Sequence, residues 1–390
     1  MIKVINGNSI EELKKFPDNY FGSVVTDPPY GLSFMGKKWD YDVPSVELWK
    51  EVFRVLKEGG HLLAFAGTRT QHRMAVNIED AGFEIRDMIA WVYGSGFPKS
   101  HNIGKVVDKL QGNERKMVGT KITNVGMKGN NFKSKSESGA VEITKSNSEW
   151  EGWGTALKPA LEPITMARKP FKTSVAENVL KNGVGGINID GCRVKLSKGE
   201  NTKRKVGGHK TSYIGGKMKK NFDIENQANR DLGRFPANFI HDGSDEVKDL
   251  FPNTVSRFFY CAKASKQDKN EGLEDFEDKK SQLNSGGIGR KISVKKRLEK
   301  NGNNTPTTKN IHPTVKPTDL MRYLVRLVTP KNEIVLDCFM GSGSTGKACA
   351  LEGLSFVGID LDKDYCKIAK ARIDKALEDK RINDSQTKLF

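Results

Sequence analysis

The sequence predicts an α/β fold with a doubly wound, mostly parallel sheet whose strands come from both ends of the chain. Short apolar runs alternate with helix-like segments in the first hundred residues, and the same alternation returns after residue 311. A glycine-rich segment opens a helix near the C-terminus, and only about thirty residues follow its second strand. These are too few to complete a sheet, so the missing strands must come from the N-terminal part and the fold is expected to be circularly permuted.

The first hundred residues are expected to supply four strands. Strands are predicted at 2–6, 22–27, 61–67 and 85–93, because each is a short apolar or β-branched run.

Helices are expected between these strands. A helix is predicted at 9–16, where Ser9 would be the N-cap and Glu12 would complete a capping box. A second is predicted at 46–57, where apolar residues recur at helical spacing, and a further helix precedes the strand at 85–93.

The middle of the chain is less regular. Residues 101–150 are predicted to be a polar insertion or loop, because 111–150 are rich in Asn, Lys, Ser and Gly. Residues 151–171 are expected to add one core strand at 162–169. Residues 172–310 show no long alternation and hold 28 Lys and Arg against 17 Asp and Glu, which gives +11 of the total charge of +17. This surplus favours a polyanionic partner such as nucleic acid, and solvated loops without a specific role are the alternative.

Residues 311–390 are expected to complete the sheet. A helix is predicted at 318–328, strands at 333–338 and 355–360, and a closing helix from 363 to about 377. The segment GSGSTG at 341–346 is expected to open a helix between the two strands.

The composition argues against a membrane protein. Hydrophobic residues make up 36% and charged residues 29% of the 390 positions, and no apolar run reaches the roughly 18 residues of a transmembrane helix. The N-terminus shows no secretory signal, so a cytoplasmic protein is expected. The five cysteines form no CxxC pair, so they are expected to be reduced thiols, and no metal site is predicted.

Two segments carry recognisable chemistry. GSGSTG at 341–346, with Asp360 at the end of the next strand, predicts an adenosine-type cofactor whose ribose diol donates to the carboxylate. Taken alone it fits a nicotinamide cofactor equally well. Asp27-Pro28-Pro29-Tyr30 follows an apolar strand, and its stiff backbone leaves carbonyl acceptors free beside a carboxylate and an aromatic ring. This set suits the exocyclic amino group of a nucleobase.

Together with a third segment, these motifs resemble those of the β-class DNA amino-methyltransferases. The three are TDPPYG at 26–31, HPTVKP at 312–317 and LDCFMGSGSTG at 336–346, in this order. The enzymes of this class methylate adenine N6 or cytosine N4 in restriction-modification systems, in bacteriophages and as orphan bacterial enzymes. The third segment alone would indicate only a stiff turn.

The resemblance covers residues 1–100, 151–171 and 311–390. It implies a Rossmann-like sheet that binds S-adenosylmethionine, with 1–100 as the catalytic half and 311–390 as the cofactor-binding half. Residues 172–310 would then be a basic target-recognition region inserted between the halves. The implied setting is the cytoplasm of a bacterium or a phage-infected cell.

The resemblance also assigns residues. Asp27 and the Pro28 carbonyl are expected to hold the amino group, Tyr30 to stack on the flipped base, and Pro29 to shape the turn. The residues expected around the cofactor are Asn8, Asp27, Thr314, Lys316, Asp337, Phe339, Met340, Gly341, Ser342, Gly343 and Asp360.

Within that set, Asp360 would bind the ribose, and Thr314 and Lys316 would reach the methionine end of the cofactor. Two positions depart from the family pattern: Asn8 stands where an aspartate is frequent, and Cys338 where proline is usual.

The implied reaction needs an extruded base, because the amino group is unreachable inside a duplex. Hydrogen bonds to Asp27 and Pro28 would localise the lone pair of the amine for in-line methyl transfer. Aspartate at position 27 favours adenine N6, and cytosine N4 is the alternative. Methylation at carbon 5 is disfavoured, because that family uses a cysteine that follows a proline and no cysteine here does.

Rival functions explain fewer of these features. A nicotinamide-dependent dehydrogenase leaves Asp27–Tyr30 and the basic region without a role. An inactive DNA-binding subunit gives no reason for all three motifs, and methyltransferases for RNA or for a glutamine amide more often carry Asn at the position of Asp27. Double-stranded DNA is the expected partner. A cognate endonuclease and a homodimer are left open, as is whether 233–240 and 257–263 contact bases or form a small core.

Overall fold

The structure, a computed structural model, describes residues 1–32, 40–96, 100–122, 140–195, 233–251, 258–280 and 307–387. The chain divides into two compact units. One is Met1–Gly94 together with Leu161–Phe390, and the other is Ser95–Ala160. All of the predicted site residues belong to the first unit.

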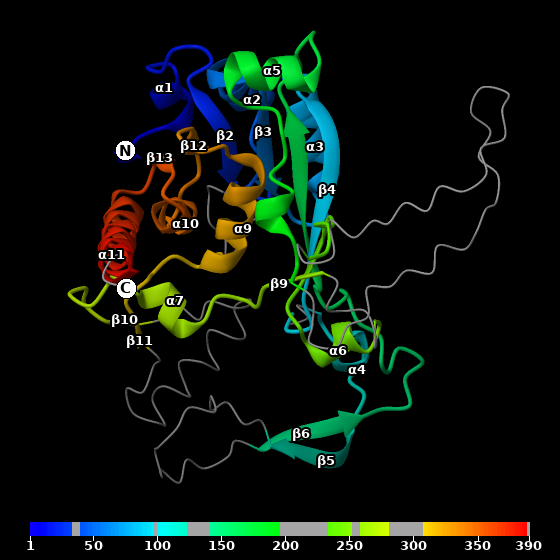
Figure 1. Ribbon diagram of the computed structural model, residues 1–390. Helices are drawn as coiled ribbons and strands as arrows, with labels where there is room; N and C mark the ends of the chain where they lie inside the picture. The colour runs from blue at the N-terminus through cyan, green and yellow to red at the C-terminus, as the bar shows by residue number, and fades with distance from the viewer. Residues whose placement is uncertain are drawn as a thin grey trace, which may run out of the picture. The chain divides into compact units, whose positions relative to one another are not determined.

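Nine strands form one sheet among the described residues of the first unit (Figure 1). Every neighbouring pair is parallel except the two that β7 makes, because β7 runs antiparallel to both β3 and β4. The order across the sheet is β1 (Ile2–Asn6), β13 (Ser355–Asp360), β12 (Ile334–Asp337), β2 (Phe21–Thr26), β3 (Leu56–Phe65), β7 (Leu161–Arg168), β4 (Glu84–Val92), β8 (Phe239–His241) and β9 (Phe259–Tyr260).

Helices cover both faces of this sheet. One face packs against α9 (Thr318–Val328), α10 (Ser344–Glu352) and α11 (Lys363–Thr387), whose buried residues share one hydrophobic core. The other face packs against α1 (Ser9–Leu13), α2 (Val46–Val55) and α3 (Gln71–Asp80), which share a second core. All six residues of β2 are buried, as expected for a strand between two helical layers. The fold is thus the predicted doubly wound α/β arrangement.

The two ends of the chain form one sheet, as the permuted arrangement requires. Strand β12 pairs in parallel with β2, and β13 pairs in parallel with β1. The N-terminal third therefore supplies the strands that the C-terminal third lacks. The predicted circular permutation is confirmed.

The winding direction of the sheet reverses between β12 and β2. The chain leaves β12 through α10 toward β13, and it leaves β2 through α2 toward β3 on the opposite face. Open α/β sheets bind ligands at the carboxyl ends of the strands at such a point. The glycine-rich loop follows β12 and Asp27–Tyr30 follow β2. The topology therefore places both motifs at the position where a ligand is expected.

The unit Ser95–Ala160 contains regular structure where the sequence predicted a polar loop. It holds α4 (Ile103–Gln111) and an antiparallel pair of strands, β5 (Lys116–Ile122) and β6 (Ala140–Lys145). Arg115 organises this unit through ion pairs with Asp108 and Glu151. The predicted insertion is thus a compact unit, and its described part contains a helix and a strand pair besides loops.

The predicted basic region also contributes to the central sheet. Strands β8 and β9 extend it beyond β4, and Phe259 stacks on Tyr323 of α9 with ring centroids 4.1 Å apart. Phe239, Phe251 and Phe258 pack together and form a partly buried aromatic cluster. The other described elements of this region and its junction are α5 (Val175–Asn182), the 3-10 helix η3 (Asp190–Cys192), α6 (Asp245–Lys248), α7 (Lys266–Asn270), β10 (Lys279–Lys280) and β11 (Thr307–Thr308).

The lysine-rich runs at 203–205, 217–220 and 295–297 lie outside the described residues. No helix within the described ranges is long and apolar enough to cross a membrane.

Several element boundaries differ from the prediction: β3 begins at Leu56 rather than at residue 61, and α1 ends at Leu13 rather than at residue 16. The N-cap of α1 is Asn8, whose side chain accepts from the backbone N–H groups of Ile10 and Glu11, while Ser9 donates to the carbonyl of Cys338. Helix α11 continues ten residues beyond the expected end at Leu377, to Thr387. Its last turns are polar and exposed, so no apolar pattern marks them in the sequence.

Candidate active site

The turn after β2 is held rigidly by residues outside the motif. Asp40 accepts hydrogen bonds from the backbone N–H groups of Tyr30 and Gly31, at 2.7 and 3.0 Å. Thr70 donates to the carbonyl of Tyr30 at 2.6 Å. The two prolines fix the preceding backbone. The turn is therefore preorganised, and Asp40 and Thr70 are supporting residues that the motif alone did not reveal.

Four polar side chains contact one another at this turn, and we call them the acceptor cluster: Asp27, Tyr30, Glu162 and Lys316. The Lys316 ammonium lies 2.6 Å from Oδ2 of Asp27 and 3.3 Å from Oε2 of Glu162. The Tyr30 hydroxyl donates to Oδ1 of Asp27 at 2.8 Å. Only 9% of the Lys316 side chain is exposed, against 18% for Asp27 and 20% for Glu162.

Burial and charge set the protonation of this cluster. Burial raises the pKa of Asp27, and the Lys316 ammonium opposes that rise without cancelling it. Burial alone would lower the pKa of Lys316, but the carboxylates of Asp27 and Glu162 raise it overall. Burial and the same two carboxylates raise the pKa of Tyr30 well above its ordinary value. Lys316 is therefore an ammonium and Tyr30 a hydroxyl donor at neutral pH.

The glycine-rich loop after β12 adopts a conformation that favours glycine. Gly341 and Gly343 have φ angles of 52° and 76°. The N–H of Gly341 donates to the Asp360 carboxylate at 2.8 Å, so the loop and the end of β13 are joined. A Cβ on Gly341 would come within 2.6 Å of Nε2 of His312, so the histidine of the HPTVKP segment packs directly on this loop.

Asp337 connects the two halves of the site. Oδ1 accepts from Thr26 at 2.7 Å, and Oδ2 accepts from Thr345 at the start of α10 at 2.5 Å. Burial raises the pKa of Asp337 to about 6. Thr26 and Asp337 end neighbouring parallel strands, so this carboxylate ties the acceptor turn to the glycine loop. Its contacts here are internal, and its predicted contact with the cofactor stays a prediction.

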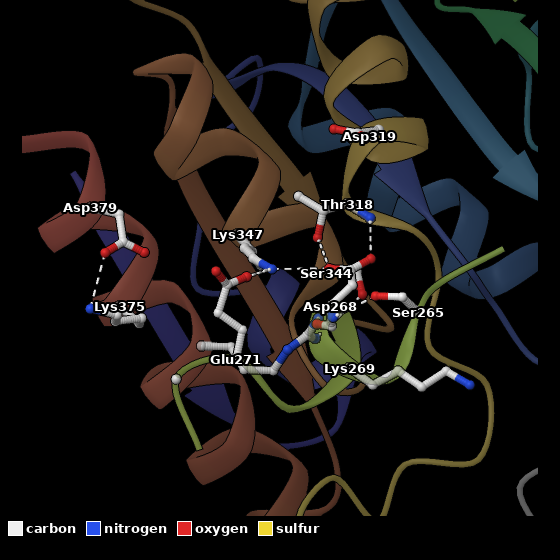
Figure 2. A network of polar contacts seen from close by, with 12 residues as sticks. Ser265, Asp268, Lys269, Glu271, Thr318, Asp319, Ser344, Lys347, Lys375 and Asp379 are labelled. Carbon is white, nitrogen blue, oxygen red and sulfur yellow. Dashed lines mark hydrogen bonds and ion pairs between the residues drawn. The ribbon is translucent and has the colours of Figure 1, made fainter. Parts of the chain in front are cut away.

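A buried arginine of α11 supports the glycine loop through hydrogen bonds. Arg372 is fully buried and donates to the Ser342 carbonyl at 2.5 Å, to the Ser342 hydroxyl at 3.1 Å and to the Asp268 carbonyl at 3.0 Å. The Asp268 carboxylate in turn accepts from Thr318 and Lys347, and Lys347 also pairs with Glu271 (Figure 2).

This network was not foreseen from the sequence, because its polar and charged members are isolated residues at four helices that lie far apart along the chain, α7, α9, α10 and α11. It fixes α7, the start of α9 and the glycine loop to one another.

A cavity of about 420 Å³ lies beside this network. Its lining includes Lys263, Asp268, Thr318, Lys347 and Asp379, and none of the acceptor cluster. The cavity is therefore distinct from the position of the acceptor turn.

The remaining predicted residues take varied positions. The Pro28 side chain is buried and Thr314 is exposed. Met340 is buried, and its N–H donates to Ile359 at 3.0 Å, while the N–H of Phe339 donates to Asp337. The carbonyl oxygen of the Asn8 side chain caps α1. The structure brings Asp27, Tyr30 and Lys316 into contact, but it gives no contact between them and Thr314 or Asn8.

The donor and acceptor groups at the glycine loop fit an adenosyl amino acid. Asp360 ends β13 with a carboxylate that suits a ribose diol, and burial raises its pKa. The positive-φ glycines let backbone approach a ligand closely. Lys316 already faces the carboxylates of Asp27 and Glu162, and its predicted contact with the methionine end of the cofactor stays a prediction. The sequence analysis did not identify Glu162 and His312 as site residues. The signal for Glu162 is an acidic residue at the start of the apolar strand 162–169.

Comparison with known proteins gives partial matches to curated methyltransferases. The chain is 27% identical to Type II methyltransferase M.HindIII of Haemophilus influenzae over 229 residues, 47% of this chain and 64% of that protein. It is 37% identical to DNA adenine methyltransferase YhdJ of Escherichia coli over 65 residues, 17% of this chain and 22% of that protein. The chain thus spans less than two thirds of the length of these relatives.

Among solved structures, the M1.HpyAVI–SAM complex covers 96% of this chain and 100% of its own at 16% identity, with a TM-score of 0.42. That similarity is too low to bear on function.

The family model N6_N4_Mtase, described as DNA methylase, matches residues 22–371. The matched range includes the acceptor cluster, the glycine loop and Asp360, and it excludes Asn8. The chain therefore belongs to the N6_N4_Mtase family of DNA methylases, and its cofactor is S-adenosylmethionine.

Proposed function

We propose that this protein transfers a methyl group from S-adenosylmethionine to the N6 amino group of an adenine in double-stranded DNA. The observation that carries the proposal is the buried carboxylate of Asp27, which faces a cation and a phenol at the carboxyl end of β2, next to the glycine loop of β12. The family membership supports the same reaction class.

The chain's own groups would act on the base. The Asp27 carboxylate and the Pro28 carbonyl would accept the two protons of the amino group, which localises its lone pair on nitrogen. The Tyr30 ring would stack on the extruded base, and the preorganised turn would orient the amine. S-adenosylmethionine supplies an electrophilic methyl group on a sulfonium. Gly341, Gly343 and Asp360 would hold the adenosine portion.

Adenine is proposed over cytosine for two reasons. Aspartate at position 27 follows the pattern of adenine-N6 enzymes in the family that the motifs resemble. One relative carries the name DNA adenine methyltransferase. Cytosine N4 is the alternative within the same family. Mass spectrometry of nucleosides from methylated DNA distinguishes them, since a dominant 4-methylcytosine peak would replace adenine in the proposal.

We also infer that the protein acts in the bacterial or phage-infected cytoplasm, on DNA held by the basic region. Sequencing of the neighbouring genes tests for a cognate endonuclease, and the mass in solution tests for a homodimer.

The test is to incubate the protein with DNA and labelled S-adenosylmethionine and to map the modified positions by methylation-sensitive sequencing. Asp27→Ala should bind cofactor as the wild type does and transfer almost no label. Unchanged transfer by Asp27→Ala would remove this carboxylate from the mechanism. No label on any DNA from the wild-type protein would contradict the proposed activity.

A further inference from the structure

Each oxygen of the Asp27 carboxylate already accepts a hydrogen bond from a side chain in the structure. Oδ1 accepts from the Tyr30 hydroxyl at 2.8 Å, and Oδ2 accepts from the Lys316 ammonium at 2.6 Å. An ammonium and an amino group are both hydrogen-bond donors, so the amine of a target base would share the Asp27 carboxylate with Lys316 and Tyr30. Each oxygen can accept a second hydrogen bond, but the Lys316 ammonium neutralises the carboxylate unless it turns away.

Glu162 offers both donors a second acceptor. Its Oε2 lies 3.3 Å from the Lys316 ammonium and 3.4 Å from the Tyr30 hydroxyl. Charge-assisted hydrogen bonds are about 2.7–2.9 Å long, so a shift of about half an ångström completes the bond from Lys316. Its other oxygen, Oε1, accepts from Tyr93 at 3.1 Å, which fixes the side chain. Glu162 lies in β7, which is paired on both sides and gives the carboxylate a rigid base.

We propose that Glu162 is a positioning residue that takes the Lys316 ammonium and the Tyr30 hydroxyl from Asp27 when the amino group of the target base binds. This inference rests on the proposed function, and it assigns a role that none of the three sequence motifs contains.

The surrounding charges favour such a transfer. Lys316 is nearly buried, and its ammonium lies 4.8 Å from the Phe65 ring centroid. If the ammonium moved away from Asp27 and found no other carboxylate, its charge would be unpaired in an apolar environment, which is strongly disfavoured. His312, which packs on the glycine loop, is neutral because burial and the charges of Lys316 and Arg372 lower its pKa to about 3. The ammonium of Lys263 lies 3.5 Å from the centroid of the Tyr93 ring. Glu162 is thus the carboxylate within reach of Lys316 besides Asp27, among the described residues.

The transfer also has a consequence for the reaction. While Lys316 pairs with Asp27, their charges largely cancel. Once Lys316 pairs with Glu162, the negative charge of Asp27 faces the amine, which gains positive charge as the methyl group arrives. Fixed charge of opposite sign at the developing charge is the arrangement that lowers a barrier.

The experiment compares Glu162→Gln, Lys316→Met and the double variant in single-turnover methyl transfer to DNA at saturating cofactor and DNA. Glu162→Gln keeps the shape but removes the charge that receives Lys316. We expect it to slow the single-turnover rate about ten- to a hundredfold, with cofactor affinity and the KM for DNA near the wild-type values. Because Glu162 acts through Lys316, the double variant should be no slower than Lys316→Met alone.

Tyr93→Phe is the matched control. It removes the donor on the other oxygen of Glu162 and leaves Lys316 untouched, so it should slow transfer less than Glu162→Gln does. Melting curves confirm that each variant is folded, and Glu162→Asp, which restores the charge, should recover part of the rate.

The inference fails if Glu162→Gln matches the wild-type rate, if the effects of Glu162→Gln and Lys316→Met multiply, or if Tyr93→Phe is as slow as Glu162→Gln. A wild-type protein that methylates no DNA would instead refute the proposed function, so the two failures are distinguishable.

Discussion

Replacing Arg372 with methionine removes the support of the glycine loop while keeping a long side chain in the same space. The guanidinium links the Ser342 carbonyl to the Asp268 carbonyl, and it also touches the hydroxyls of Ser342 and Ser344. Methionine fills most of the volume but donates no hydrogen bond. Both carbonyls would lose this charged donor.

The magnitude follows from those contacts. Two charge-assisted hydrogen bonds to buried carbonyls contribute about 3–6 kcal/mol together. Removing the buried guanidinium charge recovers part of this free energy. The charge is costly to bury, because Nε of Arg372 has no partner within the described part of the chain and burial lowers the pKa of Arg372 to about 10. We estimate this recovery at about 1–3 kcal/mol, so the midpoints of the two ranges leave a net loss of about 2.5 kcal/mol in the free energy of unfolding.

Urea unfolding at fixed pH measures this loss. Arg322→Met is the control, since Arg322 is 36% exposed and pairs with Glu352, and such surface pairs contribute less than about 1 kcal/mol. Cofactor binding by calorimetry should also weaken for Arg372→Met, because Ser342 belongs to the glycine loop. Equal urea midpoints for the two variants would show that Arg372 does not stabilise the glycine loop.

Two further predictions concern stability. Burial and the charges of Lys316 and Arg372 lower the pKa of His312 to about 3, so its contribution to stability is complete above about pH 6.5 and declines as the pH falls toward 3. His312→Gln should therefore lose less stability than the wild type between pH 6.5 and 4 in urea titrations, and parallel curves would contradict this. Asn8→Ala should lower the free energy of unfolding by about 1 kcal/mol through loss of the α1 cap, whereas Asn8→Asp should not; equal losses would exclude a capping role.

The sheet could be predicted because each of its long strands is an apolar run flanked by turn residues. The strand at 22–27 and the strand at 333–338 carry this pattern. Strands β8 and β9 could not be predicted. They are three and two residues long, which is too short for any periodicity to show.

The candidate site divides in the same way. Asp27, Tyr30 and Gly341 could be singled out because proline and glycine mark unusual backbone. The ion pair of Lys316 with Asp27 could not, since the two residues are 289 positions apart and the HPTVKP segment alone indicates only a stiff turn. Arg372 lies on a largely polar helix, where an arginine gives no sign that it is fully buried.

The distance in sequence between Asp27 and its counter-charge has a physical consequence. A buried carboxylate without a cation is strongly disfavoured, so Asp27 is stable in place only after Lys316 has reached it. Lys316 precedes α9, which packs directly on β2 and β3 as well as on α10, so Lys316 reaches Asp27 when the C-terminal elements dock on the N-terminal strands. The acceptor cluster therefore forms together with the closure of the sheet. Damage to the β2–β12 contact should remove the acceptor site before it separates β2 from β3, because these two strands pair with each other without this cation.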